Sequence, residues 1–234
     1  MATIASKLQQ VRARLAAACD AAQRPVESVT LLAVSKTFGP EQVREAALEG
    51  QLLFGENYVQ EAVLKIDALA DSRLPLEWHL IGPLQSNKAR IVAERFAWVH
   101  SVDRLAIAQR LSEHRPADLP PLQVCLQVNI SDEESKSGFS PDEALRAAAE
   151  IAALPRLRLR GLMVVPRPSD SPAEQRAPFA RLREMLARLR SEGLDVDTLS
   201  MGMSADLEAA VAEGATIVRI GSAIFGERAA HGPA

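Results

Sequence analysis

The sequence predicts a closed (β/α)8 barrel, and three observations support this fold. The chain has 234 residues, 47% hydrophobic and 24% charged, which suits one globular α/β unit of the usual size for such barrels. Short apolar runs alternate with amphipathic helical segments along the chain. Eight strand-then-helix units can be counted, so a closed parallel barrel is favoured over an open doubly wound sheet.

The first units establish the alternation of strands and helices. An extra helix is expected at about residues 2–22, and the barrel at about residues 28–230, within a single domain over 1–234. The first strand lies in "SVTLLAVS", and its helix in "GPEQVREAALEG" begins at Pro40 and ends at Gly50.

The later units repeat this pattern. The helix after "WVHSV" has Asp103 as its expected N-cap, and "SPDE" is a typical helix start. The expected strands from the second to the eighth lie in "LLFGE", "EWHLIG", "WVHSV", "LQVCLQVNI", "LRLRGLMVV", "VDTLSMG" and "ATIVRI".

Composition argues against several function classes. The net charge is −3 and the basic residues are scattered, which argues against a nucleic-acid or membrane partner. Cys19 and Cys125 have neither metal-site nor disulfide-framework spacing, so no metal is expected. No segment has the length of a signal or membrane helix, and a cytoplasmic location is expected.

Polar residues follow the ends of several strands. In (β/α)8 barrels the active face is built from the carboxyl ends of the strands and the loops after them. Lys36 ends the first apolar run, where it either reaches solvent or uses its amine chemically. The rim residues that we single out are Lys36, Asn57, His79, Ser200, Gly202, Ser204, Arg219, Gly221 and Ser222.

The last two loops have the composition of a phosphate site. "SMGMSAD" and "RIGSAIFG" follow strands seven and eight, where such barrels commonly bind phosphate. Either loop alone is explained by Ser204 capping a helix and Gly221 making a turn. Both loops together at these positions favour phosphate binding.

A phosphate site opposite a strand-end lysine predicts a phosphorylated carbonyl ligand. A lysine amine forms a Schiff base with a carbonyl, and pyridoxal phosphate carries an aldehyde and a phosphate in one molecule. A phosphorylated sugar fits the same residues, as in a barrel aldolase. Arg219, just before the last loop, could face a pyridine nitrogen and so favours the cofactor.

Several longer motifs carry a family resemblance. "AVSKT", "FGENYVQEA", "WHLIGPLQSNK", "QVNISDEESKSGF" and "LSMGMSADLEAAVAEGATIVRIGSAIFG" resemble the pyridoxal phosphate homeostasis proteins, the family that includes YggS and the proline synthetase co-transcribed homologue. The resemblance runs from Val29 to Phe225. It implies a fold-type III barrel, similar to the N-terminal domain of alanine racemase.

The resemblance also implies roles for single residues. Lys36 would form the internal aldimine with pyridoxal 5'-phosphate, and Arg219 would lie at the pyridine nitrogen. Asn57 and His79 would lie near the cofactor, although His79 could equally be a hydrogen-bonded core residue. The phosphate would be surrounded by Ser200, Gly202, Ser204, Gly221 and Ser222.

The expected function is to hold the cofactor without robust catalysis. Alanine racemases use a second base, a tyrosine from an additional β-domain, and we expect this chain, which ends at its eighth unit, to lack that domain. Tyr58 is its one tyrosine, and we expect it to pack or cap its helix. A weak amino-acid racemase is the alternative. We expect a monomer that supplies pyridoxal phosphate-dependent apo-enzymes, with Lys136 most simply a solvated loop charge.

Overall fold

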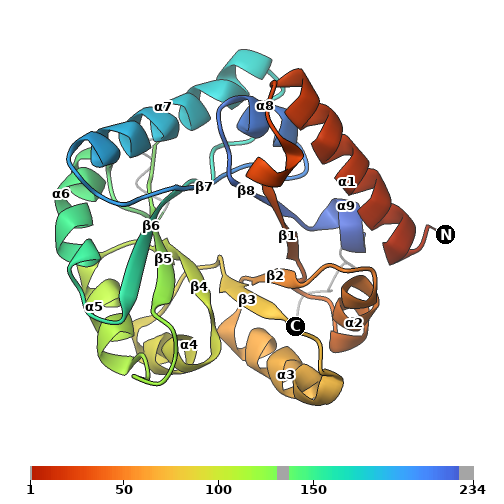
Figure 1. Cartoon of the computed structure of the whole chain (residues 1–234), viewed down its shortest axis with the longest axis horizontal. Coiled ribbons are helices and arrows are strands. Elements are labelled where there is room, and N and C mark those ends of the chain that lie inside the picture. Colours follow the sequence, from red (N-terminus) through yellow and green to blue (C-terminus); the bar gives the residue numbers. More distant parts are fainter. Residues whose placement is uncertain (1, 131–136, 227–234) are drawn as a thin grey trace, which may run out of the picture.

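The computed structural model describes residues 2–130 and 137–226, and in it the sheet is a closed barrel. Eight parallel strands pair in chain order, and β8 closes the ring on β1. Helices surround the barrel (Figure 1), so the open doubly wound sheet is excluded. The strands are β1 (Thr30–Val34), β2 (Leu53–Glu56), β3 (Glu77–Leu80), β4 (Trp98–Val102), β5 (Leu122–Gln127), β6 (Leu157–Met163), β7 (Thr198–Ser200) and β8 (Ile217–Ile220).

The helices follow the expected alternation. The longer ones are α1 (Ile4–Ala21), α2 (Pro40–Leu48), α3 (Val59–Leu69), α4 (Ala89–Arg95), α5 (Leu105–His114), α6 (Pro141–Ala152), α7 (Pro172–Ser191), α8 (Leu207–Ala212) and α9 (Ser222–Phe225). Three short 3₁₀ turns are η1 (Val26–Ser28), η2 (Ala70–Ser72) and η3 (Ser86–Lys88).

Two helix starts show how local sequence sets the boundaries. Ser140 and Glu143 form a reciprocal capping box at α6, with Ser140 N donating to Glu143 Oε2 over 2.9 Å. The expected Asp103 cap is wrong. Helix α5 begins one residue later, after Arg104, and the Asp103 carboxylate instead accepts a hydrogen bond from Arg104 over 2.7 Å.

Pairing of β1 with β8 closes the ring. Leu32 is opposite Arg219 and Ala33 is opposite Ile220 in this parallel ladder. Because parallel strands point the same way, their carboxyl ends meet on one rim. Lys36 after β1 and Gly221 after β8 therefore lie on the same side of the barrel.

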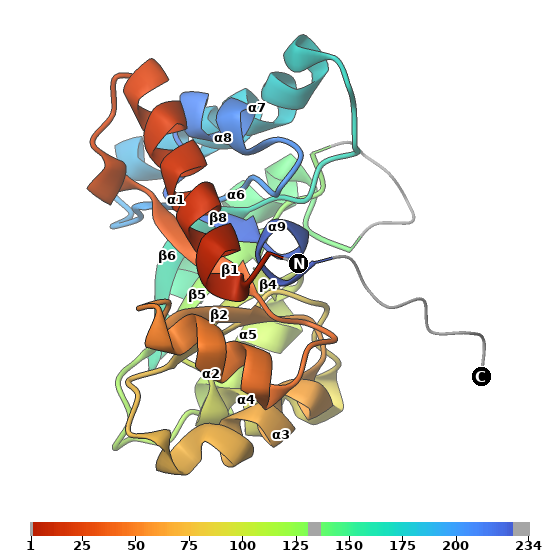
Figure 2. The same ribbon diagram turned by 90° about the vertical axis from the view of Figure 1, so that its right-hand side faces the viewer.

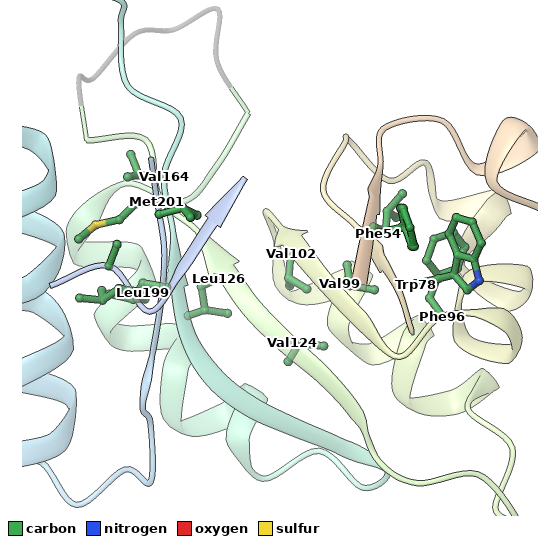
Figure 3. Packing of buried hydrophobic residues seen from close by; sticks show 14 of the residues in the cluster. Phe54, Trp78, Phe96, Val99, Val102, Val124, Leu126, Val164, Leu199 and Met201 are labelled. Carbon is green, nitrogen blue, oxygen red and sulfur yellow. The ribbon is translucent and has the colours of Figure 1, made fainter. Parts of the chain in front are cut away.

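The apolar core has two parts. The larger part lies between the strands and the helices, and Figure 3 shows Phe54, Trp78 and Phe96 gathered on one side of it. The Phe54 and Trp78 rings are 5.7 Å apart. A smaller cluster, separate from this core, is made of Leu32, Trp98, Cys125, Met163 and Ile217.

Helix α1 precedes the strand-and-helix units and contacts the loop after β7. It packs along α8 and α9, with Leu8 and Leu15 buried (Figures 1 and 2). Its Arg14 donates to Ser204 O over 2.7 Å and makes a two-point ion pair with Glu208 on α8. The additional helix thus fixes the loop after β7. Within the ranges described, no helix is long and apolar enough to cross a membrane.

The close approach of Gly82 to Asn57 gives a stability prediction. A Cβ at Gly82 would lie 2.2 Å from Asn57 O and 2.6 Å from Asn57 Cα, and both are backbone atoms. Gly82→Ala should therefore force the two loops apart and cost about 1–3 kcal/mol, a fall in Tm on the order of 5 °C in a thermal melt. The matched control is Gly39→Ala, where the nearest atom is the tip of the Gln42 side chain at 3.2 Å. Equal melting of the two variants would contradict the packing described.

Candidate functional site

A cavity of about 390 Å³ opens at the carboxyl ends of the strands. This volume is in the usual range for small-molecule sites. Its walls combine a few polar groups with apolar side chains. The apolar walls are Val34, Phe38, Ile81, Val165 and Met203, and the polar groups come from Lys36, Asn57, Ser204, Arg219 and Ser222, with Gly221 beside them.

The structure brings six of the nine sequence-predicted site residues onto this cavity and leaves three behind its wall. The six are Lys36, Asn57, Ser204, Arg219, Gly221 and Ser222. His79 and Ser200 are buried and hydrogen-bonded to other protein groups. At Gly202 the backbone has φ 94°, and a Cβ there would lie 2.5 Å from the Cβ of Ala210, so this glycine lets α8 pack closely.

Lys36 lies in a tight turn directly after β1. Thr37 has φ 68°, which is unusual for a β-branched residue. The turn is held by Phe38 N donating to Ser35 O over 3.1 Å and by Thr37 N donating to Glu61 Oε2 over 3.1 Å. The local backbone thus carries strain at the residue that follows Lys36.

A buried ion pair between Lys65 and Glu56 lies beneath this turn and contacts Ser35. Lys65 Nζ donates to Glu56 Oε1 over 2.6 Å and to Ser35 O over 2.7 Å, and Ser35 Oγ donates to the same carboxylate oxygen over 2.6 Å. Burial raises the pKa of Glu56, whereas the Lys65 ammonium and the Ser35 hydroxyl oppose that shift. The pair ties α3 and β2 to the residue that precedes Lys36.

Lys65 was not among the residues singled out from the sequence. The residues that α3 buries are Val59, Ala62, Lys65 and Leu69. Their helical spacing is the signal that could have placed Lys65 on the buried face, facing the acidic end of β2.

Arg219 presents a buried cation to the cavity. It is 4% exposed, and its Nη1 and Nη2 donate to Ser200 Oγ and Val164 O, each over 2.8 Å. Burial lowers the pKa of this guanidinium to about 10, so it stays charged at neutral pH. A fixed positive charge therefore forms part of the cavity wall.

The last two loops form a corner with hydroxyl donors. Ser222 Oγ and Ser204 Oγ are 3.4 Å apart, and Ser222 is the first residue of α9, where backbone N–H groups have no partner inside a helix. Ser204 does not cap α8, because Asp206 precedes that helix and accepts a hydrogen bond from Met203 N over 2.5 Å. The corner suits a small anion.

These groups fit a small phosphorylated carbonyl compound. The corner supplies donors for a phosphate, Lys36 supplies an amine for a carbonyl, and Arg219 supplies a cation for a ring atom that accepts hydrogen bonds. The apolar walls suit a flat ring. In the two ranges described, no three His, Cys, Asp or Glu side chains gather as a metal site would need. Lys136 lies outside the described residues.

Comparison with protein families identifies relatives over the whole chain. The family model "Alanine racemase, N-terminal domain" matches residues 7–229. A Pseudomonas aeruginosa protein named pyridoxal phosphate homeostasis protein is 59% identical over 234 residues, which is 100% of both chains. An Escherichia coli protein of the same name is 52% identical over 229 residues, covering 97% of this chain and 98% of that one.

Solved structures agree with this fold. PipY of Synechococcus elongatus with PLP bound has a TM-score of 0.84 at 40% identity, covering 96% of this chain and 100% of its own. Alanine racemase from Corynebacterium glutamicum has a TM-score of 0.69 at 20% identity, covering 94% of this chain and 62% of the racemase. At that identity the second likeness concerns the fold alone.

The Glu56–Lys65 pair predicts a pH-dependent loss of stability. Lys65→Met removes the ammonium from a buried pair, which typically costs about 3–5 kcal/mol. Without it, burial should raise the pKa of Glu56 further, so the folded variant keeps a proton that the unfolded chain releases near 4.5. The folded state then binds more protons, and the variant should lose stability as pH rises above that value.

Urea unfolding of wild type and Lys65→Met at pH 6 and pH 8 measures this effect. The expected result is a larger deficit at pH 8. Lys88→Met is the control, because Lys88 lies in the partly exposed turn η3. A deficit that stays the same at both pH values would contradict the pairing described.

Proposed function

We propose, because the chain belongs to the pyridoxal phosphate homeostasis protein family, that it binds pyridoxal 5'-phosphate in the rim cavity and serves vitamin B6 homeostasis. The observation that carries the proposal is the meeting of three groups on one small cavity. These are the Lys36 amine, the Arg219 cation and the hydroxyl corner of Ser204 and Ser222. The PLP-bound PipY structure, at 40% identity, supports the choice of ligand.

Each wall residue has a definite task in this proposal. Pyridoxal phosphate would supply an aldehyde on an electron-withdrawing ring, and Lys36 would hold that aldehyde through its amine. Ser204, Gly221 and Ser222 bind the phosphate through hydroxyl and backbone donors. Arg219 faces the ring nitrogen and, as a cation, disfavours its protonation. Asn57 borders the ring.

We propose that holding the cofactor, and not turnover, is the main activity. Two-base racemisation needs a second proton carrier opposite the lysine. Tyr58, the one tyrosine of the sequence, is 51% exposed and is absent from the cavity wall. Among the described wall residues, Lys36 and Arg219 carry the ionisable side chains, and a guanidinium is a poor proton carrier, so the wall offers no second base opposite Lys36.

A weak amino-acid racemase is the second candidate. The likeness of the fold to alanine racemases favours it, because the barrel and the strand-end lysine are the parts that such enzymes would share. The two candidates differ in whether amino acids added to the loaded protein exchange their α-hydrogen with solvent deuterium at enzymatic rates.

The remaining parts of the proposal concern the cell. We propose that the chain acts as one domain and as a monomer in the cytoplasm, and that it supplies pyridoxal phosphate-dependent apo-enzymes. The net charge of −3 with scattered basic residues supports a small-molecule role without nucleic acid or membrane partners.

Covalent labelling tests the role of Lys36. The protein loaded with pyridoxal phosphate should be yellow, and borohydride should bleach it and leave one pyridoxyl phosphate group per chain. Peptide mass spectrometry should find that group on Lys36, which is one of five lysines in the sequence. Lys36→Ala should stay colourless, whereas Lys88→Arg should label like wild type. Label on another lysine, or equal colour in Lys36→Ala, would overturn the assignment.

Removing hydroxyls from the corner tests the phosphate site. Ser204→Ala combined with Ser222→Ala should weaken pyridoxal phosphate binding roughly a hundred-fold or more, because hydrogen bonds to a charged group contribute about 1.5–3 kcal/mol each. Pyridoxal, which lacks the phosphate, should bind both proteins equally. Ser191→Ala, at the exposed end of α7, is the control. Equal losses for both ligands would place the phosphate elsewhere.

A further inference from the structure

A continuous chain of hydrogen bonds runs through the barrel interior behind the cavity. Arg219 Nη1 is 2.8 Å from Ser200 Oγ, and Ser200 Oγ is 2.7 Å from His100 Nδ1. His100 Nε2 is 2.9 Å from His79 Nδ1, and His79 Nε2 is 2.9 Å from Glu77 Oε1. We call these five residues the interior chain. It links β8, β7, β4 and β3, from the cavity wall to the amino end of the barrel.

The interior chain lies in apolar surroundings. His79, His100, Ser200 and Arg219 are each at most 4% exposed, whereas the Glu77 side chain is 43% exposed. The Trp98 ring stacks on His79 with the ring centroids 5.3 Å apart. Polar groups in such an interior are costly unless each one has a partner.

The two end residues of the interior chain, Glu77 and Arg219, fix the direction of every hydrogen bond in it. The Glu77 carboxylate can only accept, so His79 Nε2 carries a hydrogen. In a neutral ring His79 Nδ1 then accepts, and His100 Nε2 donates to it. His100 Nδ1 in turn accepts from the Ser200 hydroxyl. The Ser200 oxygen is left to accept from Arg219, which can only donate.

This arrangement requires two neutral imidazoles in the same tautomer. Burial lowers the pKa of His79 and, more strongly, that of His100. The hydrogen bond from His79 lowers the pKa of Glu77, which therefore stays a carboxylate. Other ionisable groups nearby are Arg160 on β6, 4.9 Å above the Trp98 ring, and Cys125 on β5, whose pKa burial raises to about 12. None of these groups reverses the direction of a hydrogen bond in the interior chain.

We propose that Glu77, His79, His100 and Ser200 are positioning residues that hold Arg219 in place, as a cation, against the ring of the bound cofactor. This inference rests on the proposed function for the identity of the ligand. Aligned hydrogen bonds polarise one another, so the interior chain turns the lone pair of Ser200 Oγ toward the Arg219 guanidinium and strengthens that contact. It also accounts for His79 and Ser200, which the sequence marked as site residues and the cavity wall omits.

The chain is suited to positioning and not to proton delivery. Arg219 has no lone pair that accepts a proton at neutral pH, so a proton entering at Glu77 has no acceptor at the cavity end. What the chain can transmit is the orientation and charge state of one side chain.

Nitrogen-15 NMR of the cofactor-free protein tests the direction of the chain. His79 and His100 should both give the pattern of a neutral ring with hydrogen on Nε2 from pH 6 to pH 8. Variants at His114 and His231, the other two histidines of the sequence, assign the signals. A charged ring, or hydrogen on Nδ1 in either residue, would overturn the proposal whether or not the protein binds pyridoxal phosphate.

Variants of Ser200 test the positioning role. Ser200→Ala removes one of the two hydrogen bonds that hold Arg219, leaving the one to Val164 O. It should shift the visible absorption of bound pyridoxal phosphate and weaken its binding roughly ten-fold. Ser200→Thr keeps the hydroxyl and should restore both properties, which a loss of packing alone would not predict. Wild-type absorption and affinity in Ser200→Ala would overturn the proposal.

Glu77→Gln keeps the proposal testable if Ser200→Ala does not fold. The change lies at the half-exposed end and leaves the interior atoms unaltered. Glu77→Gln should shift the absorption of bound pyridoxal phosphate in the same direction as Ser200→Ala and weaken its binding a few-fold. Wild-type absorption and affinity would contradict the positioning role of the interior chain. A wild-type protein that takes up no pyridoxal phosphate would overturn both the proposed function and the positioning role. The NMR pattern would in that case still show whether the hydrogen bonds of the interior chain run in the direction described.

Discussion

The pairing of β1 with β8 is the constraint on which the site depends. Lys36 comes early in the sequence, and Arg219, Gly221 and Ser222 come near its end, so only closure of the barrel brings them to one cavity. The contact is tight, since a Cβ at Gly221 would lie 3.1 Å from Val34 O. Helix α1 secures the neighbouring loop through Arg14. A lysine at a strand end shares a cavity with the last two loops because the ring closes beside it.

Two buried polar arrangements lie one layer behind the cavity wall. The Glu56–Lys65 pair fixes the backbone before Lys36, and the interior chain fixes the guanidinium of Arg219. Buried polar groups seldom stabilise a fold as well as apolar packing of the same volume. Their value here lies in geometry, because each one limits the position of a charged side chain on the cavity wall. The rest of the wall is apolar or backbone.

The sequence was sufficient for the fold and for most of the cavity. Strand-and-helix alternation located all eight strands, and loop position placed Lys36, Ser204 and Ser222 on one rim, because parallel strands share a direction. The sequence did not show which way a side chain at a strand end points. Ser200 and His79 point into the interior, where they hydrogen-bond to His100, and alternate residues of a strand face opposite sides, so a change of one residue in register reverses the face. Lys65 was missed because a lysine is ordinarily expected on the exposed face of a helix, although its spacing from Val59, Ala62 and Leu69 places it on the buried face.

The most direct test of the whole account is a crystal structure of the protein with pyridoxal phosphate bound. The account predicts density that joins Lys36 Nζ to the aldehyde carbon, with the phosphate between Ser204 and Ser222 and the ring nitrogen facing Arg219. A second cavity of about 570 Å³ lies at the amino ends of β3, β4 and β5, lined by Glu77, Trp98 and Arg160 among others. Cofactor found there, or in the rim cavity with its phosphate away from the two serines, would contradict the account.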